Sequence, residues 1–325
     1  MINNTIVLTE AGKKIGMGHF VRMSAVCEEL RDNDIPVRML LNSDETVNSM
    51  TNLNYVEYCN WNDGSDSMDY INAVDTVILD SYLAGYEKIN EINRKCKKLI
   101  VIDDNIRLNY SNVTIINPNY FGMFLSYPQN RGNVIYTGSG CTLLRKPFNR
   151  FFDRKIADEV SNVLITMGGT DVKNVTLKVI RYIKALDSEV SLHVVVTDAY
   201  DEIDKINCNL GANDNLYKGI DADQMSELMR LADFAVASAG GTTNELIKML
   251  CPCVLVGVAD NQLQNLKFLS ENNYVKKFEL SDLNPIRDMF MPEQRRQLFD
   301  KMKSTHSKET GISIIIGEIR GKNGK

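Results

Sequence analysis

The chain has 325 residues, of which 44% are hydrophobic and 24% charged, and its formal net charge is −5 at pH 7. This length suits about two compact domains, and the composition is that of a folded protein and not of a disordered one. The acidic balance and the lack of a dense basic block argue against nucleic acid as a partner.

The sequence shows no obvious membrane or export segment. Residues 1–14 hold one short apolar run without a small-residue cleavage site, and no run reaches the roughly eighteen apolar residues of a membrane span. We therefore expect a cytoplasmic protein without stable membrane insertion. The seven cysteines form no CxxC pair, and Cys251 and Cys253 have no histidine nearby, so we predict reduced thiols, no metal site and no cofactor. The sequence identifies no protein partner.

In the first half, short runs rich in Val, Ile and Leu alternate with amphipathic stretches. These runs cover residues 5–10, 37–41, 75–80 and 98–104. Continuous apolar strands are typical of a parallel sheet with helices on both faces, because both sides of each strand are buried. The pattern predicts a doubly wound α/β domain over residues 1–148.

A glycine-rich loop follows the first predicted strand. Gly12, Gly16 and Gly18 precede a helix that we expect to begin near His19 and to end before Pro36. Glycine lets the backbone approach an anionic ligand, and the free N–H groups of a first helical turn favour negative charge. We therefore predict that Gly16 and Gly18 contact the substrate, although the stretch is not a Walker loop.

His19 is one of only three histidines and stands where this loop meets the helix. A helix N-terminus disfavours a protonated imidazole, so His19 should be neutral near pH 7 and able to act as a general base. The alternative is a side chain that only caps the helix. We expect His193, in an apolar strand, and His306, in a polar helix, to be structural.

The alternation is interrupted near residues 145–160 by Pro147 and a run of charges, and then it resumes. The next apolar runs cover residues 162–168, 192–198, 233–240 and 253–260. The same reasoning predicts a second α/β domain over residues 149–325.

Two loops of this second domain contain paired glycines at the sheet edge where open α/β sheets bind ligands. Gly168, Gly169 and Thr170 precede a predicted helix, and residues 238–243 precede the helix that carries Glu245. We expect their backbone N–H groups to hold a diphosphate. Glu245 would then accept hydrogen bonds from a ribose diol, or else it only stabilises the first turn of its helix.

A polar cluster over residues 260–265 follows the last predicted strand. Its Asn261 and Gln262 either reach the same ligand site or belong to a helix start, where Asp and Asn are common. Asp-x-Asp triplets at residues 32–34 and 221–223 resemble metal-diphosphate sites. Because they stand at a helix end and a helix start, we interpret them as capping residues.

Four stretches taken together resemble one family: IGMGHFVRMSAV (15–26), LITMGGTDVKN (164–174), SAGGTTNELI (238–247) and ADNQ (259–262). Their order and spacing are similar to those of PseG, the UDP-2,4-diacetamido-2,4,6-trideoxy-β-L-altropyranose hydrolases of pseudaminic acid (nonulosonate) biosynthesis, a family close to SpsG. LDSY (79–82), IDD (102–104) and LLRKPF (143–148) extend the resemblance over nearly the whole chain. It implies the GT-B fold of the related MurG, in which two Rossmann-like α/β domains face a cleft.

The resemblance also implies the residues of the site. His19 corresponds to the histidine that activates water for attack on the anomeric carbon, in a metal-free reaction that inverts the configuration and releases UDP. Arg22 belongs to the same sequence element, and Tyr82 would help to hold the sugar. The implied UDP-binding residues are Gly168, Gly169, Thr170, Ala239, Gly240, Gly241, Thr242, Thr243, Glu245, Asn261 and Gln262.

Two departures from the family concern the substrate. Family members carry Arg and Asp on the first strand where this chain has Leu8 and Glu10, so the exact sugar is not implied. Gly240 and Gly241 replace bulkier residues of some relatives.

We interpret the chain as a UDP-sugar hydrolase. Transfer of the sugar to an alcohol or lipid acceptor, as in GT-B glycosyltransferases, and noncatalytic binding of a nucleotide sugar remain alternatives. His19 argues against the last of these, because binding alone needs no base.

Overall fold

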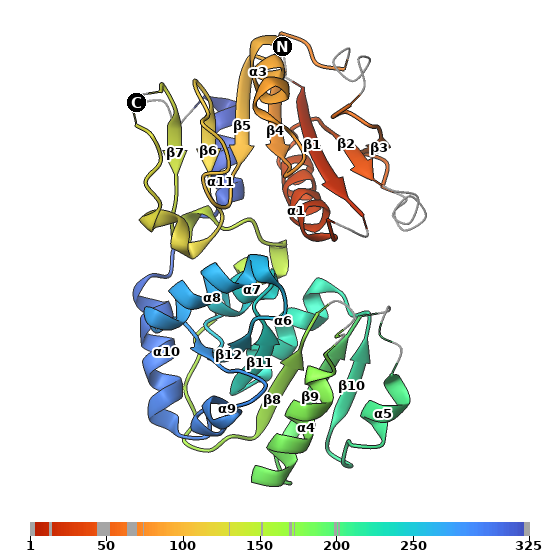
Figure 1. Cartoon of the computed structure of the whole chain (residues 1–325), viewed down its shortest axis with the longest axis vertical. Helices are drawn as coiled ribbons and strands as arrows, with labels where there is room; N and C mark the ends of the chain where they lie inside the picture. Colours follow the sequence, from red (N-terminus) through yellow and green to blue (C-terminus); the bar gives the residue numbers. More distant parts are fainter. Residues whose placement is uncertain are drawn as a thin grey trace. The chain divides into compact units, whose positions relative to one another are not determined.

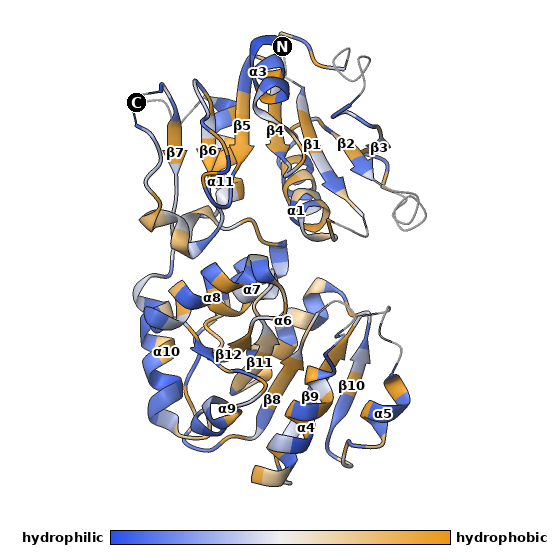
Figure 2. Cartoon of the chain, in the orientation of Figure 1, coloured by the Kyte–Doolittle hydropathy of each residue, from blue (hydrophilic) through white to orange (hydrophobic). Residues whose placement is uncertain are grey.

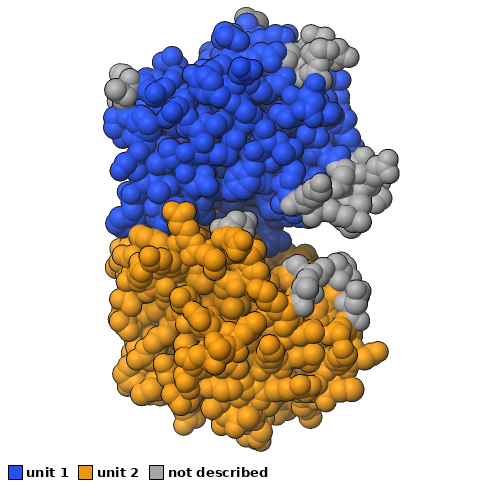
Figure 3. Space-filling model, in the orientation of Figure 1, with its two compact units in different colours: residues 1–146, 307–325 blue, residues 147–306 orange. Residues whose placement is uncertain are grey.

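The computed structural model describes residues 4–12, 15–43, 53–63, 70–73, 75–129, 131–150, 152–168, 171, 173–197, 200 and 202–321, without the side chain of Asn261. The chain divides into two compact units (Figure 3). Unit 1 comprises residues 1–146 and 307–325, and unit 2 comprises residues 147–306. Each unit is described by itself.

Unit 1 is built on a parallel sheet (Figure 1). Its strands are β1 (Thr5–Ala11), β2 (Val37–Ser43), β3 (Val56–Tyr58), β4 (Thr76–Asp80), β5 (Lys98–Ile102), β6 (Thr114–Ile116) and β7 (Val134–Tyr136), in the order β3-β2-β1-β4-β5-β6-β7. Val7 of β1 pairs with Met39 on one side and with Ile78 on the other. The four strands predicted for the first half are confirmed, while β3, β6 and β7 were not predicted.

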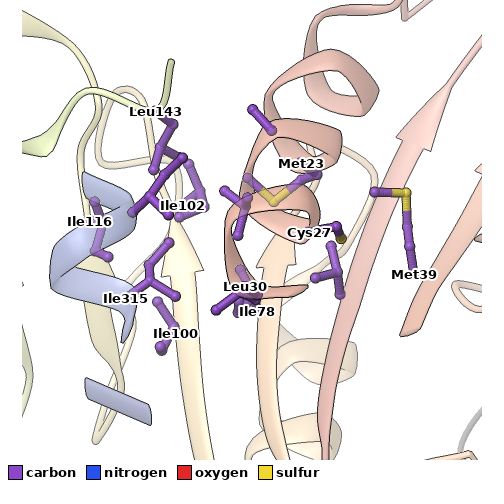
Figure 4. Packing of buried hydrophobic residues seen from close by; sticks show 14 of the residues in the cluster. Met23, Cys27, Leu30, Met39, Ile78, Ile100, Ile102, Ile116, Leu143 and Ile315 are labelled. Carbon is purple, nitrogen blue, oxygen red and sulfur yellow. The ribbon is translucent and has the colours of Figure 1, made fainter. Parts of the chain in front are cut away.

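Helices cover both faces of this sheet, as the continuous apolar strands required. The helices of unit 1 are α1 (Gly18–Asp32), α3 (Tyr86–Lys95) and α11 (Gly311–Arg320), and the short 3-10 turns are η2 (Tyr120–Phe124), η3 (Ser139–Cys141) and η4 (Lys146–Asn149), which crosses into unit 2. Met23 and Leu30 of α1 and Ile315 of α11 pack on one face with Ile78 and Ile100 (Figure 4).

Side chains at alternate strand positions point to the opposite face of the sheet. There Leu8 of β1 and Val101 of β5 pack against Ile89 and Ile92 of α3 and against Trp61. Figure 2 shows that the central strands are mostly hydrophobic, whereas the helices also carry hydrophilic residues. Among the described helices, none combines the length and hydropathy that a bilayer crossing needs.

The C-terminal segment departs from the predicted domain limits. We predicted that residues 149–325 form one domain, but residues 307–325 return to unit 1 as α11 and its flanks. The apolar side chains of α11 enter the core of unit 1, and its Glu318 carboxylate accepts hydrogen bonds from Lys98 Nζ (2.7 Å) and Tyr136 Oη (2.7 Å).

Unit 2 repeats the architecture of unit 1. Its strands are β8 (Asn162–Thr166), β9 (Ser191–Val196), β10 (Asn215–Lys218), β11 (Phe234–Ser238), β12 (Cys253–Val256) and β13 (Lys276–Lys277), in the order β10-β9-β8-β11-β12-β13. Its helices are α4 (Val175–Leu186), α5 (Ile203–Asn207), α6 (Ala222–Leu231), α7 (Thr242–Lys248), α8 (Asp260–Glu271), α9 (Asn284–Asp288) and α10 (Pro292–Ser304). The four strands predicted for the second half are confirmed.

The strand orders locate the ligand-binding edge of each unit. In both sheets the chain first adds strands on one side of its first strand and then crosses to the other side. Ligands of such sheets bind outside the C-terminal ends of the two strands where the direction reverses. These ends lie between β1 and β4 in unit 1 and between β8 and β11 in unit 2.

Candidate functional site

The loop between β1 and α1 closes tightly on itself before the helix begins. Gly16 N donates to Gly12 O at 2.7 Å, and Gly16 has φ +82°, a conformation that favours glycine. A Cβ added at Gly16 or Gly18 would meet no atom of the described residues within 4 Å. His19 follows immediately, in the first turn of α1.

His19 does not cap α1. No side chain among the described residues caps this helix, and the imidazole instead reaches the end of the neighbouring strand β4. His19 Nδ1 lies 2.7 Å from Oδ1 of Asp80, the last residue of β4. Both side chains are buried, at 7% and 0% exposure. The helix-cap interpretation of His19 is therefore wrong.

Asp80 fixes the tautomer of this imidazole. Burial by itself would raise the pKa of Asp80, but the Arg22 guanidinium and His19 outweigh it and hold that pKa below its ordinary value. An ionised carboxylate only accepts hydrogen bonds, and an unprotonated Nδ1 would set its lone pair against that carboxylate at 2.7 Å. Nδ1 also lies 3.2 Å from Arg22 Nη2, but the Asp80 carboxylate is closer, so we infer that the hydrogen sits on Nδ1 and that Nε2 carries the lone pair of the neutral imidazole.

Arg22 lies one turn after His19 on the same helix face and joins two carboxylates. Its Nε and Nη2 donate to Asp80 at 2.5 Å each, and its Nη1 and Nη2 donate to Asp104 at 3.0 Å each. Asp104 follows β5, and the same guanidinium lowers its pKa to about 2 despite burial. Two carboxylates and one guanidinium leave this group with one net negative charge.

Tyr82 lies in the loop that follows β4 and contacts both His19 and Asp104. Its ring meets the His19 ring edge to face, with centroids 4.5 Å apart, and its hydroxyl donates to Asp104 Oδ2 at 2.6 Å. Burial and the neighbouring Asp104 raise the pKa of Tyr82, so the phenol stays protonated. Asn119 Nδ2, from the loop after β6, donates to Asp104 Oδ1 at 2.8 Å.

The two first-strand residues that depart from the family lie inside unit 1. Leu8 is 1% exposed and belongs to the apolar cluster under α3, so it is not a contact of the site. Glu10 is fully buried, and its carboxylate accepts hydrogen bonds from the loop that carries Tyr82.

In unit 2, a side chain of the loop between β8 and α4 accepts hydrogen bonds from backbone N–H groups at the start of α4. The Asp171 carboxylate accepts the N–H groups of Val175 and Thr176, each at 2.9 Å. Gly168 has φ +60° and is placed as predicted, after β8. Gly169 and Thr170 lie outside the described residues, so their predicted contacts have no structural account.

The loop between β11 and α7 has room at its second glycine. Within the described part of the chain, α7 has no side-chain cap, and a Cβ added at Gly241 would meet nothing within 4 Å. The predicted contacts Ala239, Gly240, Gly241, Thr242 and Thr243 form this loop and the first helical turn. Thr243 is fully buried. Glu245 is also buried, at 8% exposure.

Gln262 brings the third loop of unit 2 to the same place. Its Oε1 accepts the N–H of Val258 at 3.0 Å, and its Nε2 lies 3.7 Å from the position of a Cβ on Gly240. Ser238 Oγ lies 3.8 Å from such a position on both Gly168 and Gly240. Gly168, Ser238, Gly240 and Gln262 therefore share the C-terminal edge of β8, β11 and β12.

The remaining sequence predictions concern structural residues. His193 contacts Asn162 at 3.1 Å, at the N-terminal edge of its sheet and away from the ligand-binding edge, as its structural interpretation requires. Asp221 caps α6 in a reciprocal pair with Gln224, as predicted. Asp32 ends α1 and forms an exposed ion pair with Lys146.

The structure thus gathers His19, Arg22 and Tyr82 in unit 1, and Gly168, Gly240 and Gln262 in unit 2. Sequence reasoning did not select Asp80, Asp104 or Asn119, although the first two lie in stretches that resembled the family. The usable signal was their position at or shortly after the ends of the consecutive parallel strands β4, β5 and β6, because such strand ends meet at one edge.

Comparison with solved structures defines the class of fold. The chain has the two-unit α/β architecture of GT-B glycosyltransferases. The glycosyltransferase SnogD from Streptomyces nogalater aligns with a TM-score of 0.60 and 11% identity, over 99% of this chain and 100% of that one. Arabidopsis thaliana UGT89C1 complexed with UDP-L-rhamnose aligns with a TM-score of 0.59 and 10% identity, over 98% and 100%. Likeness at such identity shows the fold alone.

Comparison of sequences adds two relatives. An uncharacterized protein of Methanocaldococcus jannaschii is 26% identical over 298 residues, which cover 87% of this chain and 60% of that protein. A Helicobacter pylori protein described as pseudaminic acid cytidylyltransferase and UDP-2,4-diacetamido-2,4,6-trideoxy-β-L-altropyranose hydrolase is 26% identical over 226 residues, 68% of this chain and 41% of that protein. This chain therefore matches only part of each relative's length. No protein-family model matches the chain.

Proposed function

We propose that this chain hydrolyses a UDP-sugar by direct attack of water on the anomeric carbon, with His19 as the general base. One observation carries the proposal: His19 Nδ1 lies 2.7 Å from the buried, ionised Asp80, a contact that would hold the hydrogen on Nδ1 and leave Nε2 able to accept a proton. A noncatalytic binding protein would not need a buried carboxylate to set the tautomer of a histidine.

In the proposed step, Nε2 of His19 takes a proton from water while the water oxygen bonds to the anomeric carbon. The bond from that carbon to the phosphate oxygen breaks on the opposite side, its electron pair leaves with UDP, and the configuration inverts. The imidazolium forms beside Asp80, in a group where the two carboxylates of Asp80 and Asp104 and the single guanidinium of Arg22 leave one net negative charge that favours it. The step uses neither a metal nor a cofactor.

Unit 2 would bind the nucleotide. The diphosphate would rest on the open loop of residues 239–243 and on Gly168, with Gln262 as a side-chain donor. Glu245 would accept hydrogen bonds from the ribose. Gly169, Thr170 and Asn261 stay proposals from the sequence, as does a place for the sugar near Gly16, Gly18 and Tyr82.

The specific UDP-sugar that we propose as the substrate is UDP-2,4-diacetamido-2,4,6-trideoxy-β-L-altropyranose, in pseudaminic acid biosynthesis. The printed description of the Helicobacter pylori relative supports it, together with the resemblance of residues 15–26 and 238–247.

A second candidate function is transfer of the same sugar to an acceptor, and one observation favours it: solved structures of like fold include glycosyltransferases. The two candidates differ in whether UDP is released without an acceptor.

The test is to incubate purified protein with the UDP-sugar alone and to follow the anomeric protons by NMR. Hydrolysis predicts free UDP and a free sugar that first appears with inverted configuration. His19→Asn should slow turnover by about two to four orders of magnitude and keep the affinity for UDP, while His306→Asn, the matched control, should behave as wild type. Turnover only after an acceptor is added would favour transfer, and a near-normal rate for His19→Asn would refute His19 as the base.

A further inference from the structure

Glu10 is a buried carboxylate whose purpose the fold does not explain. It is the second-last residue of β1 and has no exposed surface. Ile6 and Leu8, at the alternate positions before it, are apolar and pack under α3. Burial of a carboxylate is costly unless hydrogen bonds compensate it, so an apolar residue would serve packing on this face better.

The carboxylate of Glu10 holds one loop, the connection from β4 to α3. Its Oε1 accepts the backbone N–H of Tyr82 at 2.6 Å, and its Oε2 accepts the hydroxyl hydrogen of Ser81 in a short hydrogen bond. The Ser81 oxygen is thereby turned to accept the N–H groups of Leu83 and Ala84, each at 3.0 Å. A single side chain of β1 thus organises four consecutive residues of another connection.

This loop determines where the Tyr82 ring lies. The backbone N–H of Tyr82 is fixed by Glu10, its ring edge lies against His19, and its hydroxyl is bonded to Asp104. Without the bond from Glu10, Tyr82 would be held by its ring contact with His19, by its hydroxyl and by a longer hydrogen bond of 3.4 Å from Arg107 Nη1 to its carbonyl oxygen. Its 44% exposure means that little other packing confines it.

We infer that Glu10 is a positioning residue, which places Tyr82 against the His19 imidazole and so restricts the orientation of the base. The structural part of the inference stands on the contacts of Glu10, whereas its effect on rate rests on the proposed function. Glu10 is fully buried and cannot itself touch a substrate. Its influence passes through Tyr82.

The first measurement needs no substrate. In protein labelled with ¹³C-histidine, the ring protons of His19 sense the aromatic ring of Tyr82, and His19→Asn assigns their signals among the three histidines. In Glu10→Gln and Glu10→Ala these signals should shift toward their positions in Tyr82→Leu, while those of His193 and His306 stay in place. Glu10→Gln keeps the size of the side chain, so it remains informative if Glu10→Ala does not fold.

The matched control is Thr9→Val. Thr9 is the adjacent residue of β1, is equally buried, and has a hydroxyl without a hydrogen-bond partner among the described residues. This variant should leave the His19 signals unchanged. Signals of His19 that stay at their wild-type positions in folded Glu10→Gln, or that do not respond to Tyr82→Leu, would overturn the inference.

The second measurement connects the position of the ring to catalysis. In Glu10→Gln, kcat for the UDP-sugar should fall by about tenfold to a hundredfold, because small misplacements of a catalytic group cost rates of that order. KM and the affinity for UDP should stay within about twofold, which a general loss of folded protein would not produce. A kcat equal to that of wild type would refute the catalytic part. Failure of the wild type to hydrolyse any UDP-sugar would refute the proposed function, but it would not affect the NMR test of the structural inference.

Discussion

Replacement of Asp80 with asparagine should remove the general base while leaving His19 in place. In the folded chain the Asp80 carboxylate accepts one hydrogen bond from His19 and two from Arg22. The amide of asparagine offers one acceptor and one donor in the same space. If its oxygen stays with the guanidinium, its NH₂ group faces Nδ1 of His19, which must then become an acceptor and shift its hydrogen to Nε2.

The size of the effect follows from the loss of that lone pair. Loss of a general base costs about 10² to 10⁴ in rate, or about 2.7 to 5.4 kcal/mol in activation free energy. The variant also leaves the Arg22 guanidinium with one carboxylate, Asp104, instead of two. A buried ion pair that loses one partner costs about 3 to 5 kcal/mol, and the remaining Asp104 should hold the cost near the lower limit.

The assay must separate these two effects. We would measure kcat at saturating UDP-sugar, the affinity for UDP by calorimetry, and unfolding by urea. Asp214→Asn is the matched control, because Asp214 is also a buried carboxylate that pairs with a cation, Lys184, but lies in unit 2 at the opposite sheet edge. Both variants should lose stability, and only Asp80→Asn should lose turnover. A folded Asp80→Asn protein whose kcat is within about fivefold of wild type would refute the tautomer argument.

Three further predictions follow from the same contacts. Tyr82→Phe keeps the ring beside His19 and removes the hydrogen bond to Asp104, so the free energy of unfolding by urea should fall by about 1 to 2 kcal/mol. A kcat reduced more than tenfold would contradict the positional role of Tyr82. The pKa of Asp104 falls from its ordinary value of 3.8 to about 2 on folding, so the ionised carboxylate stabilises the fold by about 2 kcal/mol above pH 5. This stabilisation is lost as the pH falls through 2. Urea unfolding should therefore show a lower stability at pH 2.5 than at pH 5, and Asp104→Asn should show a smaller difference. Gly122→Ala would place a Cβ 2.5 Å from Cγ of Asn117, whose amide bonds Tyr127, so it should lower the melting temperature measurably, whereas Gly85→Ala, with nothing within 4 Å, should not.

The sequence predicted the parts of the fold whose signals are local. The apolar runs that became β1, β4 and β5 were recognised by their consecutive Val, Ile and Leu residues, because strands buried on both faces are mostly apolar. β6 and β7 have three residues each, too short for such a signal. The helix start at His19 was visible because glycines precede it.

The site was only partly predictable, because its contacts join distant residues. Asp80 is 61 residues from His19, and Asp104 is 82 residues from Arg22. Nothing in the spacing reports such pairs, although the rule that parallel strand ends meet at one edge would have brought them together. The return of α11 to unit 1 was missed for the same reason. Its isoleucines indicate burial, but they do not indicate against which core.

The two ligand edges differ in charge, and this difference argues for a division of work between the units. At the edge of unit 1, Asp80, Asp104 and the guanidinium of Arg22 form a group with one net negative charge. At the edge of unit 2, Gly168 and Gly240 leave room beside the hydroxyl of Ser238.

Because the same strand order recurs in both sheets, the fold alone does not decide which unit binds the anion. The side chains decide it. Under the proposed function, Gly16 and Gly18 of unit 1 would face the neutral sugar and not the diphosphate, because the carboxylates of Asp80 and Asp104 lie beside them.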